Sequence, residues 1–148
     1  MNAVVRPGRM YIETLTQLLE EGFKRGIFSE FDYEPEHMHA EGLYIRKTKT
    51  LPAGLIIVTK VHKQQNVAIS LKGTVTCFDQ NGKRTVIGPG ELFVTEPGTQ
   101  RAIYCHDEVE WATIHAANTD NVEELESMIF CNNFTEFDAL LNDMRVAA

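Results

Sequence analysis

Hydrophobic residues recur every three or four positions near both ends of the chain, which is the spacing of an amphipathic helix. The first such segment covers residues 10–25, and Gly26 follows it as a typical stop signal. Two more segments cover residues 121–130 and 135–145, with Asp120 and Thr135 as the expected caps. We therefore expect one helix before the central part of the chain and two after it.

Alternating hydrophobic and polar residues fill the central part, and this period of two is typical of β-strands. Glycine and proline turns separate the alternating runs, and Asn81-Gly82 is the strongest hairpin signal. The expected strands cover residues 43–48, 55–62, 67–71, 74–78, 83–87, 92–95, 101–105 and 108–116. The pattern predicts an all-β domain, a sandwich or a barrel, with flanking helices.

The expected organisation is one globular domain. Residues 1–42 form an arm, a helix and an irregular loop, in which residues 6–8 break the chain. Residues 43–117 form the barrel, and residues 118–148 form the C-terminal helices. The strand at 55–62 has apolar residues on both faces, so one face needs cover from a helix or a second subunit. We therefore expect a homo-oligomer, with a dimer as the simplest state.

Charge is unevenly distributed along the chain. The net charge is −7, but residues 43–101 carry nine Lys or Arg and only three Asp or Glu. An acidic chain is a poor binder of duplex DNA, whose affinity depends on neutralised phosphates. A local basic pocket for a small anion is compatible with this distribution.

The remaining composition indicates where the protein works. The three cysteines form no CxxC pair, which favours reduced thiols in a cytoplasm. There is neither an apolar run long enough to span a membrane nor an apolar stretch after the basic N-terminus. We expect a cytoplasmic protein that has no contact with membranes.

Two motifs carry a resemblance to a known family. Lys60 and His62 share one face of a strand, Asn66 follows after three residues, and Gly73 closes the next strand. This spacing resembles the first motif of the cupins. The run from Gly90 to Arg101 is similar to the second cupin motif, with Glu96 at the usual proline and Arg101 at the usual third histidine.

The resemblance implies a cupin-type double-stranded β-helix, a jelly-roll barrel with one N-terminal and two C-terminal helices. It also implies that Lys60, His62, Asn66 and Arg101 occupy the usual metal-ligand positions. Lysine and arginine are cationic at neutral pH and do not ligate a divalent ion, so we expect no metal cofactor at these positions. The alternative metal site is a set of three histidines, His37, His39 and His62.

A pocket with this set of residues is suited to an anion. Arg101 offers a rigid fork of donors and Lys60 a compact charge, and both groups suit phosphate or carboxylate. An ion pair with an internal acid such as Glu96 is the alternative, because an unpaired buried cation is unfavourable. The candidate neighbours in the pocket are Gln64, Gln65, Tyr104 and Trp111.

The runs at 43–46, 51–54, 61–63, 97–101 and 111–115 are similar to small single-domain cupin proteins of tailed phages. Three functional hypotheses follow. The first is a non-catalytic protein that binds an anionic small molecule, such as a cyclic nucleotide signal sequestered in an infected cell. The second is an oligomeric assembly protein. The third is a metal-dependent dioxygenase or isomerase that uses His62 with His37, His39 or His115.

Overall fold

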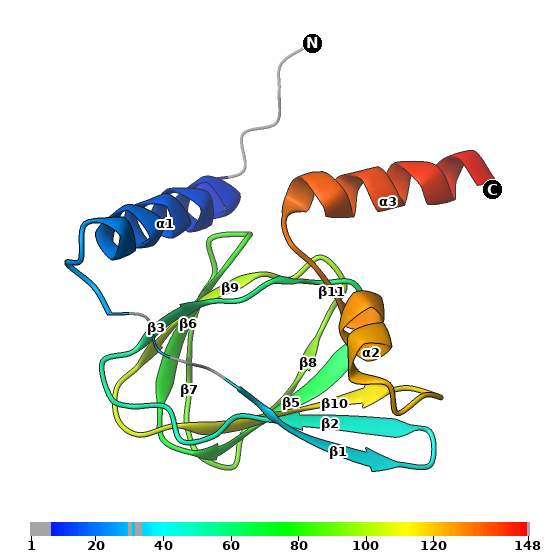
Figure 1. Cartoon of the computed structure of the whole chain (residues 1–148), viewed down its shortest axis with the longest axis horizontal. Helices are drawn as coiled ribbons and strands as arrows, with labels where there is room; N and C mark the ends of the chain where they lie inside the picture. The colour runs from blue at the N-terminus through cyan, green and yellow to red at the C-terminus, as the bar shows by residue number, and fades with distance from the viewer. Residues whose placement is uncertain (1–6, 30, 32–33, 148) are drawn as a thin grey trace.

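The chain is described here from a computed structural model, which covers residues 7–29, 31 and 34–147 (Figure 1). Its helices are α1 (Pro7–Lys24), α2 (Val122–Ile129) and α3 (Phe134–Ala147). Its strands are β1 (Glu36–Ala40), β2 (Leu43–Lys47), β3 (Ile56–Val58), β4 (Val61–His62), β5 (Asn66–Lys72), β6 (Val75–Asp79), β7 (Arg84–Ile87), β8 (Leu92–Thr95), β9 (Arg101–Cys105), β10 (Glu110–Ala116) and β11 (Phe130–Cys131).

The strands form two main antiparallel sheets. One sheet has the order β1-β2-β10-β5-β8 and the other β3-β9-β6-β7, while β4 and β11 form a separate short pair. Figure 1 shows the sheets curving around a common interior, with α1 and α3 on the side away from the five-stranded sheet. The expected all-β architecture with one N-terminal and two C-terminal helices is confirmed.

The expected loop before residue 43 contains a strand. β1 pairs with β2, with His39 opposite Tyr44, and thereby becomes the edge of the five-stranded sheet. All of its residues are exposed, so the alternation of buried and exposed positions that identifies a strand is missing. Gly42, with φ +74°, makes the turn into β2.

The expected strand at 55–62 is divided. β3 pairs with β9, whereas β4 pairs with β11. The break falls at Thr59, whose side-chain Oγ1 accepts a hydrogen bond from the backbone N of Arg101 at 3.0 Å. The side chain of Gln100 donates to the Thr59 carbonyl at 2.9 Å. The expected continuous strand is therefore interrupted at Thr59, where side-chain hydrogen bonds form and the pairing partner changes from β9 to β11.

The helix ends also differ from expectation. Pro7 begins α1 instead of breaking the chain, because proline is compatible with the first helical position. A loose arm was expected at residues 1–9, but residues 7–9 belong to α1, and residues 1–6 lie outside the described residues. Asn121 and Asn133 take the capping roles expected of Asp120 and Thr135, since their side chains accept from the backbone N of Glu124 and Glu136 at 3.0 and 2.9 Å.

The hydrophobic core has three parts. The largest lies between the two sheets and contains Leu51, Val75, Cys77, Ile87, Cys105 and Val109. A second joins Tyr44 to α2, and a third joins Val61 to the start of α3. The two C-terminal helices therefore pack against the barrel through separate clusters, and α2 contributes Glu126 to the cavity inside it. All three cysteines are free and buried. None of the helices in the described ranges combines the length and the apolar character that crossing a membrane requires.

Candidate functional site

A cavity of about 290 Å³ lies inside the barrel, between the two sheets. Its apolar lining includes Leu51, Ile57, Val75, Ile103, Val109 and Trp111. Its polar lining includes Arg46, Thr48, Lys60, His62, Arg101, Thr113 and Glu126. The cavity therefore combines a hydrophobic wall with a group of cationic and hydrogen-bonding side chains.

Arg101 begins β9 and is largely withdrawn from solvent. Its Nη1 donates to Thr95 Oγ1 at 3.0 Å, and its guanidinium lies 5.1 Å from the centre of the Phe93 ring. Among the residues that the structure describes, no Asp or Glu forms an ion pair with it. Burial lowers the pKa of Arg101, because removal from water disfavours its charge. Arg101 is thus a desolvated cation held by a hydroxyl and an aromatic ring.

A second arginine in the cavity has a carboxylate partner. Arg46 Nη1 lies 2.8 Å from Glu126 Oε1, and this pair joins β2 to α2. The Arg46 guanidinium also lies 5.2 Å from the centre of the Phe130 ring. Glu126 therefore offsets the charge of Arg46, whereas Arg101 forms no ion pair among the described residues and feels only the more distant charge of Asp79, opposite it on β6.

His62 is buried and lines the same cavity as these two cations. Its Nδ1 lies 3.0 Å from the Thr99 carbonyl oxygen, which accepts, so Nδ1 carries the proton and Nε2 is left as an acceptor. Burial lowers the pKa of His62 to about 4, against the opposing effect of the Thr99 carbonyl, and Arg101 and Arg46 lower it further. His62 is therefore a neutral hydrogen-bonding group at pH 7.

Trp111 and Lys60 are two further residues that the sequence singled out and that line the cavity. The backbone N of Trp111 donates to Thr48 Oγ1 at 2.9 Å, and its ring meets the Phe93 ring edge to face at 5.2 Å. These contacts hold the indole in a fixed position in the cavity wall. Lys60 is exposed and lies at the margin of the same cavity.

The structure brings together four of the residues singled out in the sequence: Lys60, His62, Arg101 and Trp111. Tyr104 is instead exposed on the opposite face of β9, with its ring edge against His106. It alternates with Arg101 and Ile103, which face inward, so its expected place in the pocket was wrong. Gln64 is partly exposed and does not line the cavity.

Asn66 is buried in the barrel but does not line the cavity. Neither of its amide atoms has a hydrogen-bond partner within the described residues. The expected pairing of Arg101 with Glu96 is not formed. The Glu96 carboxylate instead accepts from Gln65 Nε2 at 3.0 and 3.2 Å near the surface.

The alternative three-histidine metal site is also not formed. His37 and His39 lie on β1 against Tyr44, and His37 Nδ1 is 2.6 Å from the Tyr44 hydroxyl. Within residues 7–29, 31 and 34–147, no three His, Cys, Asp or Glu side chains are grouped to hold a metal ion. Lysine and arginine at two of the usual cupin ligand positions do not fit a divalent ion.

Sequence reasoning missed two charged side chains of the cavity, Arg46 and Glu126. The sequence did contain a signal for Arg46, because strand alternation places it on the same face as Tyr44 in β2 and as Thr48, which follows β2. The sequence contained no such signal for Glu126. It lies 80 residues from Arg46 along the chain, and the two side chains come into contact only when α2 packs against the barrel.

The comparisons with known proteins concern the fold. No family model matches the chain, and none of the curated proteins does. Among solved structures, an uncharacterized conserved protein with a double-stranded beta-helix domain from Klebsiella pneumoniae is similar, with a TM-score of 0.52 and 14% identity over 62% of this chain and 83% of that one. Protein NMB1881 from Neisseria meningitidis has a TM-score of 0.50 and 14% identity over 62% and 90%.

A putative ethanolamine utilization protein Q from Salmonella typhimurium is also similar, with a TM-score of 0.50 and 9% identity over 62% of this chain and 80% of that one. At such low identity these similarities establish the fold alone. The chain thus has a double-stranded β-helix fold, which is the fold that the two sequence motifs predicted.

Proposed function

We propose that this protein is a non-catalytic binding protein for an anionic small molecule, which it holds in the barrel cavity. The observation that carries the proposal is Arg101, a desolvated guanidinium with no carboxylate partner among the described residues. A cation withdrawn from water without a counter-charge is unfavourable. A bound carboxylate or phosphate would supply that charge in the bidentate geometry that arginine favours.

The charges around the cavity support the same ligand class. Three cationic side chains, Arg46, Lys60 and Arg101, line it together with one carboxylate, Glu126. His62 stays neutral at pH 7 because burial lowers its pKa to about 4. The cavity therefore carries a formal excess of positive charge, which favours the entry of anions.

The apolar wall and the volume of the cavity further restrict the class of anionic ligands that would fit. A cavity of about 290 Å³ lies at the lower end of the range for small-molecule sites. The apolar wall favours a ligand with an apolar or aromatic part beside its anionic group. A nucleotide meets this description, with its phosphate at Arg101 and Lys60 and its base against the Trp111 ring. If the chain is phage-encoded, such binding would sequester a nucleotide signal of the host, including a cyclic one.

Trp111 provides a direct test, because it is the one tryptophan of the chain and lines the cavity. Its fluorescence would be followed while inorganic phosphate, aromatic carboxylates, nucleoside monophosphates and cyclic mono-, di- and trinucleotides are added. Each anion would be paired with a neutral counterpart, such as the nucleoside or the amide. We expect saturable binding of at least one anion and binding of its neutral counterpart weaker by roughly tenfold or more. Calorimetry would provide a second readout.

The matched variants are Arg101→Met in the cavity and Arg84→Met on the exposed strand β7. Arg101→Met should weaken binding of the anion by roughly tenfold or more, whereas Arg84→Met should leave it unchanged. Equal binding of anions and neutral counterparts would overturn the proposal, as would an Arg101→Met variant with unchanged affinity. Absence of binding by either readout up to millimolar concentrations of every anion would do so as well.

A further inference from the structure

The outer face of the five-stranded sheet is apolar across all five strands. Strand register places Met38 on β1 opposite Ile45 on β2, and Ile45 opposite Ile114 on β10. Ile114 lies opposite Val67 on β5, which lies opposite Val94 on β8. Residues paired in this way point to the same side of an antiparallel sheet. The result is one unbroken row of apolar side chains across the full width of the sheet.

Neighbouring positions on the same face extend this row. Ile69 lies opposite both Ala112 and Leu92, and Ala40 lies opposite Leu43, which lies opposite Ala116. The edge strands are well exposed, with Leu92 at 63% and Met38 at 55%. We call this surface the outer apolar face: Met38, Ala40, Leu43, Ile45, Val67, Ile69, Leu71, Leu92, Val94, Ala112, Ile114 and Ala116.

The helices of the described chain pack elsewhere. α1 lies along β6 of the other sheet, and α2 and α3 lie against β11. Figure 1 shows α1 and α3 on the far side of the barrel from β1, β2, β10 and β5. A continuous apolar patch of this kind on a soluble domain typically marks an interaction surface.

The size of the outer apolar face lies at the lower end of the range for specific interfaces. Five strands spaced about 4.8 Å apart, each contributing positions over about 20 Å, give a face of roughly 500 Å² per copy. Two such faces would together bury roughly 1,000 Å², which is the lower limit for a specific interface. Sheets that pack face to face in this way form the interior of β-sandwiches.

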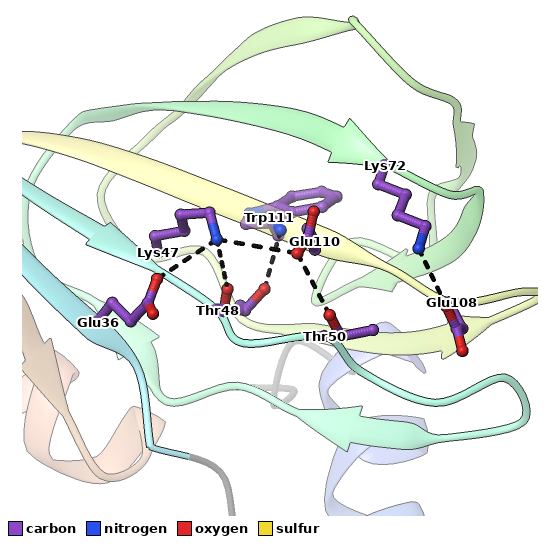
Figure 2. Close-up of polar contacts among 8 residues, drawn as sticks. All are labelled: Glu36, Lys47, Thr48, Thr50, Lys72, Glu108, Glu110 and Trp111. Atoms are coloured by element: carbon purple, nitrogen blue, oxygen red, sulfur yellow. Dashed lines mark hydrogen bonds and ion pairs between the residues drawn. The ribbon is translucent and has the colours of Figure 1, made fainter.

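The charges on this face favour a second copy of the same chain. The protein carries a net charge of −7, so two copies repel each other over most of their surfaces. On the outer apolar face the charged side chains gather at one corner. There Lys47 Nζ lies 3.4 Å from Glu36 Oε2 and 3.9 Å from Glu110 Oε1, as Figure 2 shows. One lysine faces two carboxylates there, so the corner carries a formal charge of −1, whereas the twelve residues of the outer apolar face are uncharged.

We infer that the outer apolar face is the interface of a homodimer, in which the five-stranded sheets of two copies pack against each other. An uncharged apolar face is compatible with a copy of itself, as an isologous contact requires. Small residues, Ala112 and Ala116 on the central strand and Ala40 at the edge, allow the larger side chains of the partner sheet to approach. The charged corner then lies at the rim, where ion pairs stay in contact with water. This inference does not depend on the proposed ligand.

The test is the oligomeric state of the full chain between about 1 and 100 µM, measured by sedimentation velocity and by light scattering. We expect a dimer whose fraction rises with concentration. Ile114→Lys, at the centre of the face, should shift the dissociation constant upward at least tenfold, because it places a charge in the middle of the apolar contact. Leu92→Lys on the exposed edge strand β8 tests the same face at a position where the fold tolerates a charge.

Val86→Lys is the matched control. Val86 is a 55% exposed apolar residue on β7 of the other sheet, so this substitution makes the same chemical change away from the proposed interface. It should leave the dimer intact. A wild-type chain that remains monomeric at 100 µM would overturn the inference, as would a dimer that neither Ile114→Lys nor Leu92→Lys weakens. An equal loss of dimer with Val86→Lys would place the interface elsewhere.

Discussion

Arg101 illustrates how one residue can reduce the stability of the folded protein and at the same time favour the binding of an anion. Its guanidinium is withdrawn from water, yet in the described structure its contacts are a hydroxyl and an aromatic ring rather than a carboxylate. Replacement of a desolvated charge by an apolar side chain of similar size is often stabilising. The same substitution that weakens an anionic ligand should therefore strengthen the empty fold.

We predict that Arg101→Met raises the midpoint of thermal unfolding of the ligand-free protein by roughly 2–4 °C, which corresponds to about 1 kcal/mol for a chain of this size. Differential scanning calorimetry at pH 7 would measure the shift. Arg84→Met, at an exposed position, should change the midpoint by less than half as much. A lower midpoint for Arg101→Met would show that Arg101 has a compensating partner and would weaken the case for a ligand.

The two buried histidines predict how stability depends on pH. Burial lowers the pKa of both His62 and His115 to about 4, and each is further lowered by nearby Arg46. As the pH falls below the usual pKa of about 6.5, the unfolded chain takes up these protons before the folded chain does. Stability present at pH 7 is therefore lost between about pH 6.5 and pH 4, by up to roughly 3 kcal/mol for each histidine.

Urea unfolding at pH 7 and at pH 4.5 would measure this loss. His115→Gln removes one of the two titrating groups and keeps a polar side chain next to Thr113, to which His115 Nε2 lies at 2.8 Å. The variant should lose roughly 2 kcal/mol less than the wild type between the two pH values. An identical loss would mean that His115 takes up its proton equally in the folded and unfolded chains.

At the scale of elements, the close approach of α1 to the turn between β6 and β7 requires a glycine. Gly8, in the first turn of the helix, is buried against the backbone of residues 80–82 in the turn between β6 and β7. A Cβ at this position would overlap the Gly82 nitrogen and the Gln80 carbonyl, which are backbone atoms and cannot rotate away. The absence of a side chain therefore allows the helix to lie on the hairpin.

Gly8→Ala should consequently loosen α1, although alanine is the better helix former. We expect faster hydrogen exchange of the α1 amides and a loss of about 1–3 kcal/mol of stability, as overpacking typically costs. Thr14→Ala, at an exposed position in the same helix, controls for helix propensity and should be neutral or slightly stabilising. Unchanged exchange in Gly8→Ala would show that the helix shifts without cost.

At the scale of the whole molecule, the five-stranded sheet separates two roles by its two faces. Thr113 faces the cavity and Ile114, the next residue of β10, faces outward. The proposed ligand site and the proposed dimer interface therefore share strands but no side chains. An experiment can therefore disprove one of these two proposals without affecting the other.

We predict that Ile114→Lys, which should separate the dimer, binds the anion found in the fluorescence titration with an affinity within about threefold of the wild type. The reason is that its side chain points away from the cavity, on a strand whose ladder contacts are unchanged. Arg101→Met should conversely leave the dimer intact. A loss of anion binding in the monomeric Ile114→Lys variant would show that the two faces are coupled through the sheet.

Most of the fold follows from patterns along the chain. Eight strand regions and three helices were predicted within a few residues, because turn glycines and hydrophobic periods are local properties. β1 was missed because all of its residues are exposed, and the break at Thr59 because it depends on hydrogen bonds from residues 100 and 101. The two misses differ in cause, since the break at Thr59 is decided by a distant segment, whereas β1 pairs with the neighbouring strand β2 and lacks the alternation that identifies a strand.

The sequence by itself determined the double-stranded β-helix fold and most of its elements, whereas the assignment of Lys60 and Arg101 to metal-ligand positions stays a prediction. The tertiary structure alone decided which side chains meet: Arg46 with Glu126, and the five apolar residues that line up from Met38 to Val94. A period of two says which residues share a face of a strand. It does not say which face is inside or which strands are neighbours, because those pairings join segments far apart in the chain.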